Sequence, residues 1–503
     1  MDPKKVVIVG AGPGGLAAAM ILAHRGFSVT VCEKKSAVGG RNSLLRLGAY
    51  SFDLGPTFLM MKEILEEVFE EAGAEAGDHL EFRRLEPMYR LQFSDRKLEP
   101  TTDRDSMRDE IRRTFPGKEA SLDRYLSREK RRFEHLYPCL QKSYSSPTDL
   151  ISLNLLRAVP HLGLNKRLFN LLYDYFRDEQ LALSFTFQAK YLGMSPWECP
   201  GLFSILSYIE HAFGVYHTMG GLGKNCSAMA EVAEGNGAEI RLNSPVKTIR
   251  FQGRRATGVE LEGGEVIEAD EVVINADFGY AAENLFPAGF LRKYSPEKLR
   301  RRKFSCSTFM LYLGLDRKYD LPHHTIFFAD DYRKNVDEVF QAKTLSRDFS
   351  FYVRNASITD PSLAPTGGSA VYVLVPVPNL RGEIDWDEET ASFRDMVLTA
   401  MEQRAGMSGL RTAIQVEKVI NPRDWLVKHD VYAGAVFNLA HSLNQMIYLR
   451  PRNRFEECGC CYLVGGGTHP GSGLPTIYES GRITADLICR KHGIPFRRAR
   501  SRI

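Results

Sequence analysis

A strand, a glycine-rich turn, a helix and a second strand follow one another at the amino terminus. Val6 to Val9 form a β-branched run typical of a buried parallel strand, and Gly10-Ala-Gly12-Pro-Gly14-Gly15 follows directly. A helical pattern then extends to about Gly26, and residues 28–32 predict the second strand, which ends just before Glu33. This order of elements predicts a dinucleotide-binding unit.

Each position of this unit has a physical role. Gly10 permits a tight turn, Gly12 lets the backbone approach a pyrophosphate, and Gly15 lets the helix pack closely on the strand. The helix amino terminus offers free N–H groups to the phosphates, and Glu33 stands at the spacing expected for a ribose-binding carboxylate. The predicted cofactor contacts in this part of the chain are Gly10, Gly12, Pro13, Gly14, Gly15, Glu33 and Lys34.

Length and composition limit the class of protein. A chain of 503 residues is too long for one hydrophobic core, so two closely associated domains are expected. A net charge of +4, with basic and acidic residues interleaved, predicts no nucleic-acid partner. Cys458, Cys460 and Cys461 lack a matching ligand pair at zinc spacing, so we predict reduced cytoplasmic thiols and no metal.

Two segments raise the question of a membrane surface. No apolar stretch is long enough to span a bilayer, so any membrane contact is predicted to be peripheral. Residues 151–176 mix apolar and basic side chains, which fits either an interfacial element or an ordinary packed helix. The arginines of residues 490–502 could bind an anionic surface or belong to a solvated, frayed terminus.

The middle of the chain changes character twice. Residues 60–144 carry charges at helical spacing and predict a helical layer. From residue 240 to 267 alternating residues and glycine turns predict an antiparallel meander, and Val272 to Asp277 predicts a return to a buried strand. A second strand-rich stretch covers residues 304–436, where a β-rich layer could wall a substrate channel.

Residues 461–482 combine a short strand, a glycine-rich loop and a helix that begins near Pro475. The loop contains Thr468-His469-Pro470-Gly471, and Gly39-Gly40-Arg41 and Phe52-Asp-Leu-Gly-Pro-Thr57 follow the amino-terminal unit. Together with Val272-Val-Ile-Asn-Ala-Asp277, these segments closely resemble the bacterial-type phytoene desaturases. These carotenoid desaturases are amine-oxidase-like flavoproteins, and the resemblance extends over essentially the whole chain.

The resemblance implies FAD as the cofactor and adds further contacts. The paired glycines and arginine would extend along the pyrophosphate, the Asp-x-Gly-Pro segment would pass near the flavin ring, and the helix at Pro475 would point its positive end at the ring. The contacts implied in this way are Gly39, Gly40, Arg41, Gly55, Pro56, Thr57, Val246, Asp277, Gly465, Gly466, Gly473, Leu474 and Pro475.

We therefore expect an α/β fold in which an FAD-binding Rossmann-like domain is interleaved with an α+β substrate domain and a helical region that could face a membrane. The FAD-binding domain is placed at residues 1–95, 215–285 and 445–503. The helical region is placed at residues 96–214 and the β-rich substrate domain at residues 286–444.

The implied activity is dehydrogenation of a long isoprenoid polyene such as phytoene or diapophytoene, by hydride transfer to flavin N5. Related reactions on the same fold remain open, namely oxygenation of a carotenoid, dehydroxylation and saturation. A non-catalytic prenyl-lipid carrier is a further alternative, but both cofactor ends of the chain are intact. Because no second nucleotide motif occurs, a membrane quinone or oxygen is the predicted electron acceptor.

Catalytic residues are harder to assign, because the cofactor carries the difficult step. The family's proposed acid–base pair aligns near residues 151–160, where Arg157 is present but Asn154 stands at the acidic position. This departure weakens the case for a carboxylate base. His217 and His469 are alternative candidates from the motifs, although a lone histidine is more often structural.

Overall fold

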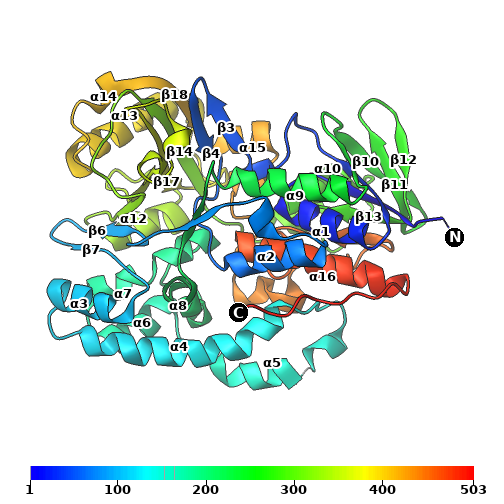
Figure 1. Ribbon diagram of the computed structural model, residues 1–503, viewed down its shortest axis with the longest axis horizontal. Helices are drawn as coiled ribbons and strands as arrows, with labels where there is room; N and C mark the ends of the chain where they lie inside the picture. The colour runs from blue at the N-terminus through cyan, green and yellow to red at the C-terminus, as the bar shows by residue number, and fades with distance from the viewer. Residues whose placement is uncertain (1, 152, 164) are drawn as a thin grey trace.

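The computed structural model describes residues 2–151, 153–163 and 165–503. The fold is mixed α/β, as predicted. A parallel sheet and a mostly antiparallel sheet lie at opposite ends of the molecule, and a layer of helices runs below them in Figure 1.

The parallel sheet has five strands in the order β19-β13-β1-β2-β9. Its strands are β1 (Lys5–Val9), β2 (Ser28–Cys32), β9 (Glu239–Arg241), β13 (Glu271–Ile274) and β19 (Cys461–Leu463). All neighbouring pairs are parallel, so segments from far-apart parts of the chain meet in one sheet. The predicted strands at the amino terminus and after residue 271 are confirmed.

Both faces of this sheet are covered, which explains the continuous apolar run in β1. Val6 and Ile8 pack on one face against helices, and Val7 and Val9 pack on the other face. The covering helices are α1 (Pro13–His24), α9 (Gly223–Gly235) and α16 (Leu474–Lys491).

An antiparallel meander covers the second face. It consists of β10 (Val246–Gln252), β11 (Arg255–Leu261) and β12 (Val266–Glu268), followed after β13 by α10 (Phe278–Asn284) and α11 (Pro296–Arg300). The prediction placed residues 240–242 in this meander, which is wrong. Residues 239–241 form β9 and pair in parallel with β2, because alternation along a strand does not specify its partner.

The second large sheet has seven strands in the order β18-β14-β17-β16-β15-β6-β7. They are β6 (Arg90–Gln92), β7 (Lys97–Leu98), β14 (Ser307–Leu315), β15 (His324–Phe327), β16 (Phe351–Asn355), β17 (Ser369–Val377) and β18 (Ile414–Ile420). Leu311 and Leu313 pack with α13 (Trp386–Arg404) and α14 (Leu410–Ala413) on the outer face. Met310 and Tyr312 alternate with them and point to the opposite face, toward the middle of the molecule.

The helical layer contains most of the remaining elements. Its helices are α3 (Arg104–Thr114), α4 (Glu119–Leu140), α5 (Leu153–Ala158), α6 (Leu168–Phe176), α7 (Glu179–Ser184) and α8 (Ile205–Phe213), whereas α2 (Lys62–Glu71) packs against α1 and α16. The remaining elements outside this layer are β3 (Leu44–Leu47), β4 (Tyr50–Asp53), β5 (Phe82–Arg84), β8 (Tyr216–Thr218), α12 (Tyr332–Asp337) and α15 (Pro422–His429).

The prediction of a helical layer over residues 60–144 is only partly correct. The short strands β5, β6 and β7 interrupt the helices. These strands are only two or three residues long, so they leave no periodic signal in the sequence. Within the residues that the structure describes, no helix is both long and apolar enough to cross a membrane.

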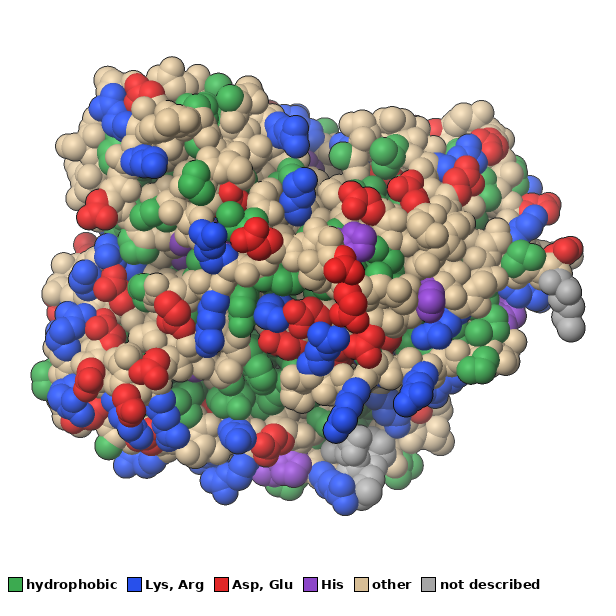
Figure 2. All heavy atoms as spheres, viewed as in Figure 1, with side chains coloured by type: hydrophobic (Ala, Val, Ile, Leu, Met, Phe, Trp, Pro, Cys, Tyr) green, Lys and Arg blue, Asp and Glu red, His purple; other side chains and the backbone are tan. Residues whose placement is uncertain are grey.

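The carboxyl-terminal tail lies against α2 and α16. The guanidinium of Arg498 binds Glu479, and Arg502 pairs with Glu70 at 2.9 Å. Figure 2 shows acidic side chains gathered near the middle of this face, with basic side chains below them. The ion pairs of Arg498 and Arg502 hold part of the tail against the protein, so the terminus is not simply frayed.

Candidate functional site

A cavity of about 900 Å³ lies between the two large sheets. One side of its lining comes from the loops that follow β1, β2, β13 and β19, and the other side comes from β14, β16 and β17. All predicted cofactor residues lie on this lining except Gly14, Gly15 and Gly39. Their contacts with FAD stay predictions, but the fold brings distant motifs to one place.

The glycines of the turn stand at positions where a side chain would collide with neighbouring protein atoms. A Cβ at Gly12 would lie 2.8 Å from the amide nitrogen of Asn275, and a Cβ at Gly15 would lie 2.5 Å from the carbonyl oxygen of Gly10. Asn275 Nδ2 donates a hydrogen bond to that same oxygen. Helix α1 begins immediately after Gly12, with Pro13 in its first turn, so its free N–H groups lie at the edge of the cavity.

The carboxylate of Glu33 lies at the end of β2, at the edge of the cavity. One carboxylate oxygen accepts a hydrogen bond from the backbone N–H of Ala11 at 2.8 Å, and the other accepts one from Lys35 at 2.9 Å. A carboxylate can accept further bonds, so the group can also receive ribose hydroxyls. The ammonium group of Lys34 is paired with Asp430.

Arg41 reaches the lining from the turn formed by Gly39 and Gly40. Its guanidinium lies 3.4 Å from Asp277 and donates a hydrogen bond to the carbonyl of Val436 at 2.8 Å. Burial raises the pKa of Asp277, and the charge of Arg41 opposes that shift. The arrangement holds a cation at the cavity wall, where a pyrophosphate could bind it.

The loop after β4 is fixed by tyrosines of the seven-stranded sheet. Tyr312 donates a hydrogen bond to the carbonyl of Leu54 at 2.5 Å, and Tyr372 donates one to that of Gly55 at 2.9 Å. A Cβ at Gly55 would approach the carbonyl of Arg41 to 2.5 Å. The sequence predicted the loop but not these tyrosines, although their alternation along predicted strands could have indicated one shared face.

The carboxyl-terminal loop completes the wall. Gly465 and Gly473 adopt φ angles of +92° and +115°, which other residues rarely adopt, and α16 begins at Leu474 with Pro475 in its first turn. The fully buried Arg450 donates hydrogen bonds to the carbonyl of Gly466 at 2.6 Å and to that of Thr468 at 3.0 Å. The amino terminus of α16 therefore faces the cavity, where its partial positive charge favours an anionic group.

The three candidate catalytic residues lie outside the cavity lining. Arg157 is exposed on α5, and the side chain of its neighbour Asn154 lies outside the described residues. His217 is fully buried, accepts a hydrogen bond from Arg354 at Nδ1 and hydrogen-bonds through Nε2 to Asp360 at 3.0 Å.

His469 is buried within the glycine-rich loop, where its ring and that of Tyr144 pack edge to face at a centroid distance of 5.0 Å. Neither histidine lines the cavity, so neither is placed to contact a molecule bound there.

The residues present fit a dinucleotide that carries a flavin. Two helix amino termini, one arginine and a row of side-chain-free positions converge on one side of the cavity, as a pyrophosphate requires. Glu33 and Val246 mark one end of this row, while Gly55 to Thr57 and Gly466 mark the other. The opposite wall is mainly apolar.

Residues 13–489 match a protein family described as flavin containing amine oxidoreductase. A 4,4'-diapophytoene desaturase (4,4'-diapolycopene-forming) from Methylomonas sp is 51% identical over 496 residues, which cover 99% of this chain and 97% of that protein. An all-trans-zeta-carotene desaturase from Myxococcus xanthus is 38% identical, and the alignment covers 97% of this chain and 94% of that protein. The structure of an oxidoreductase from Methanosarcina mazei shares the fold, with a TM-score of 0.63 and 16% sequence identity. The match covers 97% of this chain and 100% of that one.

Proposed function

Because this chain belongs to the carotenoid desaturases within the flavin containing amine oxidoreductase family, we propose that its substrate is a C30 polyene of the diapophytoene type. The chain is an FAD-dependent oxidoreductase, and its reaction class is carotenoid desaturation. The observation that carries the C30 assignment is the 51% identity to a 4,4'-diapophytoene desaturase along 99% of the chain.

The chemistry explains why the cavity has two unlike walls. A CH2–CH2 unit beside isolated double bonds has no carbonyl to acidify its hydrogens, so simple proton abstraction is difficult. Bound FAD supplies an acceptor for the hydride. The protein must then hold one carbon of the hydrocarbon in position and exclude water.

The wall formed by the seven-stranded sheet suits that task. Met310, Leu374, Pro376 and Ile326 are apolar side chains on its cavity face, and Phe187 adds an aromatic ring from the helical layer. A polyene carries no group for hydrogen bonding, so its affinity for this wall comes from apolar surface removed from water. This wall is our proposed binding surface for the substrate.

The substrate assignment is tested with purified, FAD-loaded protein and two polyenes in liposomes, diapophytoene and phytoene. We expect new conjugated absorption to develop faster with diapophytoene. Equal or faster turnover of phytoene would contradict the C30 assignment. A product that contains added oxygen, or that has lost a double bond, would instead favour oxygenation or saturation.

We also propose that the surface around α5 binds a membrane, because the substrate dissolves in lipid. Ile151, Leu156 and Val159 are 76%, 58% and 54% exposed, and Arg157 lies among them. Exposed apolar side chains beside a basic one are typical of an interfacial segment. In Figures 1 and 2, α5 and many basic side chains lie along the lower edge of the molecule.

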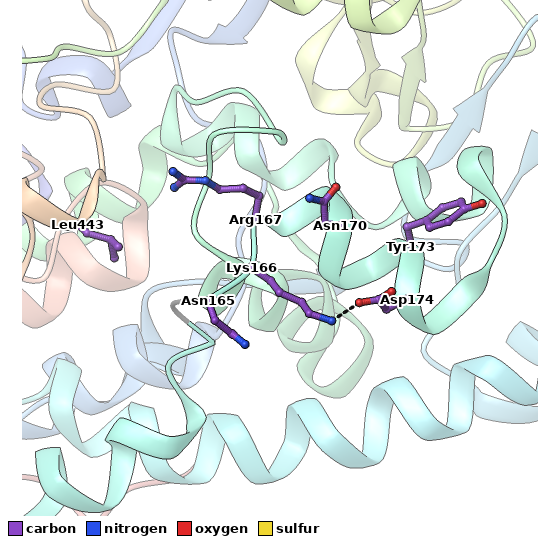
Figure 3. A pocket seen from close by; sticks show the side chains of 7 residues that line it. All are labelled: Asn165, Lys166, Arg167, Asn170, Tyr173, Asp174 and Leu443. Carbon is purple, nitrogen blue, oxygen red and sulfur yellow. Dashed lines mark hydrogen bonds and ion pairs between the residues drawn. The ribbon is translucent and has the colours of Figure 1, made fainter.

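A shallow hollow of about 460 Å³ lies between α6 and the loop at Leu443. In Figure 3, Arg167 and Asn170 lie above Asn165 and Lys166, and the ammonium group of Lys166 points to Asp174. The hollow contains none of the predicted cofactor residues, so we do not regard it as the reaction site. Its amide and cationic groups are suited to the polar edge of a membrane.

Membrane binding is tested by flotation of the protein with anionic liposomes. We expect Ile151→Asp to reduce the bound fraction, since a carboxylate would have to enter the apolar layer. Val427→Asp is the matched control, because Val427 is 66% exposed on α15, away from this surface. Equal loss in both variants, or no loss in either, would contradict the assignment of this surface.

The reduced cofactor must be reoxidised, and we propose a membrane quinone or oxygen as the acceptor. The proposal is supported by the single dinucleotide motif of the chain and by the lipid-soluble substrate. Multiple turnovers without oxygen and without quinone would refute it.

A further inference from the structure

A short chain of hydrogen bonds leads from the cavity into the protein along the seven-stranded sheet. The hydroxyls of Thr57 and Tyr352, both on the cavity lining, are hydrogen-bonded to each other at 2.9 Å. The Tyr352 hydroxyl also hydrogen-bonds to Nδ1 of His324 at 2.7 Å. His324 is fully buried, and Nε2 on the far side of its ring has no hydrogen-bond partner among the described residues.

Strand geometry brings these groups together. Tyr352 on β16 pairs with Ile326 on β15, and His324 lies two residues before Ile326, so all three side chains share the cavity face. The ring of Phe58 stacks on that of His324 with centroids 4.1 Å apart and planes inclined by 14°. The position of the imidazole is therefore fixed.

Burial disfavours the charged form of both titratable groups. Burial lowers the pKa of His324 well below its usual value, and the nearby charges of Arg354 and His217 act in the same direction. Burial raises the pKa of the Tyr352 phenol, which Arg354 partly opposes. A neutral imidazole next to a neutral phenol can accept the phenol's proton when the phenol oxygen receives another.

The other tyrosines on this face provide a contrast. Tyr312 and Tyr372 direct their hydroxyls at backbone carbonyls of the loop after β4, where they can only donate. Tyr352 instead connects a group on the cavity lining to a base. Arg354, behind it, is held by Asp53 at 2.7 Å and by His217, so its charge is not available to the cavity.

Resting on the proposed desaturation, we propose that Tyr352 accepts the proton that the substrate loses, and that His324 takes up the proton of Tyr352. Hydride removal leaves one substrate carbon electron-deficient. The adjacent C–H bond then breaks, its electron pair forms the new double bond, and its proton binds the Tyr352 oxygen. The former hydroxyl proton moves to Nδ1 of His324, and after the product leaves it returns through the Tyr352 and Thr57 hydroxyls to water that enters the cavity before the next turnover.

The test compares Tyr352→Phe with Tyr50→Phe, which also removes a buried hydroxyl, one that donates to the carbonyl of Leu315 away from the cavity lining. Both variants are loaded with FAD and mixed with diapophytoene that carries deuterium on either carbon of the reacting unit. We expect Tyr352→Phe to keep its FAD and to desaturate about 100-fold more slowly, the lower range for loss of a general base. The deuterium effect on the proton-losing carbon should rise in this variant and stay unchanged in Tyr50→Phe.

A merely structural role would slow the reaction without a change in that isotope effect. An unchanged isotope effect, or a Tyr352→Phe rate equal to that of the wild type, would overturn the assignment. If Tyr352→Phe does not retain FAD, His324→Asn replaces it, since the amide oxygen can accept the Tyr352 hydrogen bond but cannot take up the proton. Failure of the wild-type protein to desaturate diapophytoene would overturn both the proposed function and this relay. If the wild-type protein desaturates normally but the variants give the contradicting results, only the relay is overturned.

Discussion

The two walls of the central cavity are built in different ways. The wall predicted to hold FAD consists largely of loop backbone at the ends of parallel strands, where Gly12 and Gly55 stand at positions at which a Cβ would collide with neighbouring residues. The opposite wall consists of alternating side chains from strands of the seven-stranded sheet, such as Met310, Tyr352 and Leu374. Substitutions on the first wall should therefore affect cofactor retention, and substitutions on the second should affect substrate binding and rate.

The largest expected effect is on the first wall. We predict that Gly12→Val abolishes FAD retention, because its Cβ would lie 2.8 Å from Asn275 and the side chain would fill the space for the pyrophosphate. Flavin absorbance per protein after gel filtration measures this. Gly235→Ala, where no atom lies within 4 Å of the new Cβ, is the control. Normal flavin content in Gly12→Val would remove the assignment of this turn.

The next largest effect is expected for a buried ion pair that connects the two walls. Arg354 on the sheet and Asp53 before the flavin-side loop form an ion pair at 2.7 Å, and both side chains are at most 2% exposed. Arg354→Met should lower the free energy of unfolding by about 3–5 kcal/mol, because Asp53 would remain buried and unpaired. Denaturant titration measures this loss.

Arg250→Ala serves as the control for that substitution, since Arg250 is 53% exposed and its surface ion pair with Glu260 should contribute little to stability. If Arg354→Met and Arg250→Ala lose equal stability, the buried pair does not connect the walls.

A pH-dependent effect is expected behind the second wall. Burial raises the pKa of Glu210 from 4.5 to about 8, although Gln188 and Tyr89 donate hydrogen bonds to it. Between these two pH values the folded protein binds a proton that the unfolded chain has lost, so stability falls as the pH rises. The Glu210→Gln variant has no carboxyl group at this position, so its stability should not fall with pH for this reason.

The stability of Glu210→Gln relative to the wild type should therefore increase from pH 6 to pH 8, by about 1.4 kcal/mol for each pH unit at most. Melting temperatures across this range provide the measurement. A difference that does not vary with pH would show that Glu210 is ionised in the folded protein.

The smallest effect should separate the two walls most cleanly. Leu374→Ala removes apolar surface from the sheet wall, so diapophytoene should bind about 1 kcal/mol more weakly. FAD affinity should stay at the wild-type value, since the side chain lies on the substrate wall. Parallel titrations with FAD and with polyene in liposomes measure both. Loss of FAD affinity equal to the loss of polyene affinity would break the distinction between the walls.

The sequence predicted the first wall well because its signals are local. A β-branched run followed by glycines at fixed spacing specifies a strand and a tight turn, and the structure has both at β1 and α1. The same applies to the loop and helix after Cys461. The motifs also predicted residues that the fold gathers around one cavity.

The second wall could not be predicted in the same way, because it depends on pairing between distant strands. Tyr352 and His324 meet only through the register of β15 and β16, which alternation alone does not specify. The parallel pairing of β9 was missed for the same reason, whereas β5 to β7 were missed because strands of two or three residues leave no periodic signal. Motif position suggested His217 and His469 as candidates, yet the structure buries both outside the cavity lining.

The most direct test of the account is a single-turnover experiment without oxygen. Purified, FAD-loaded protein is mixed with diapophytoene in liposomes, and flavin bleaching and the polyene spectrum are followed together. We predict that bleaching and new conjugated absorption develop with one time course, because both report removal of hydrogen from the polyene that lies between the two walls. Bound polyene without either change would contradict the account.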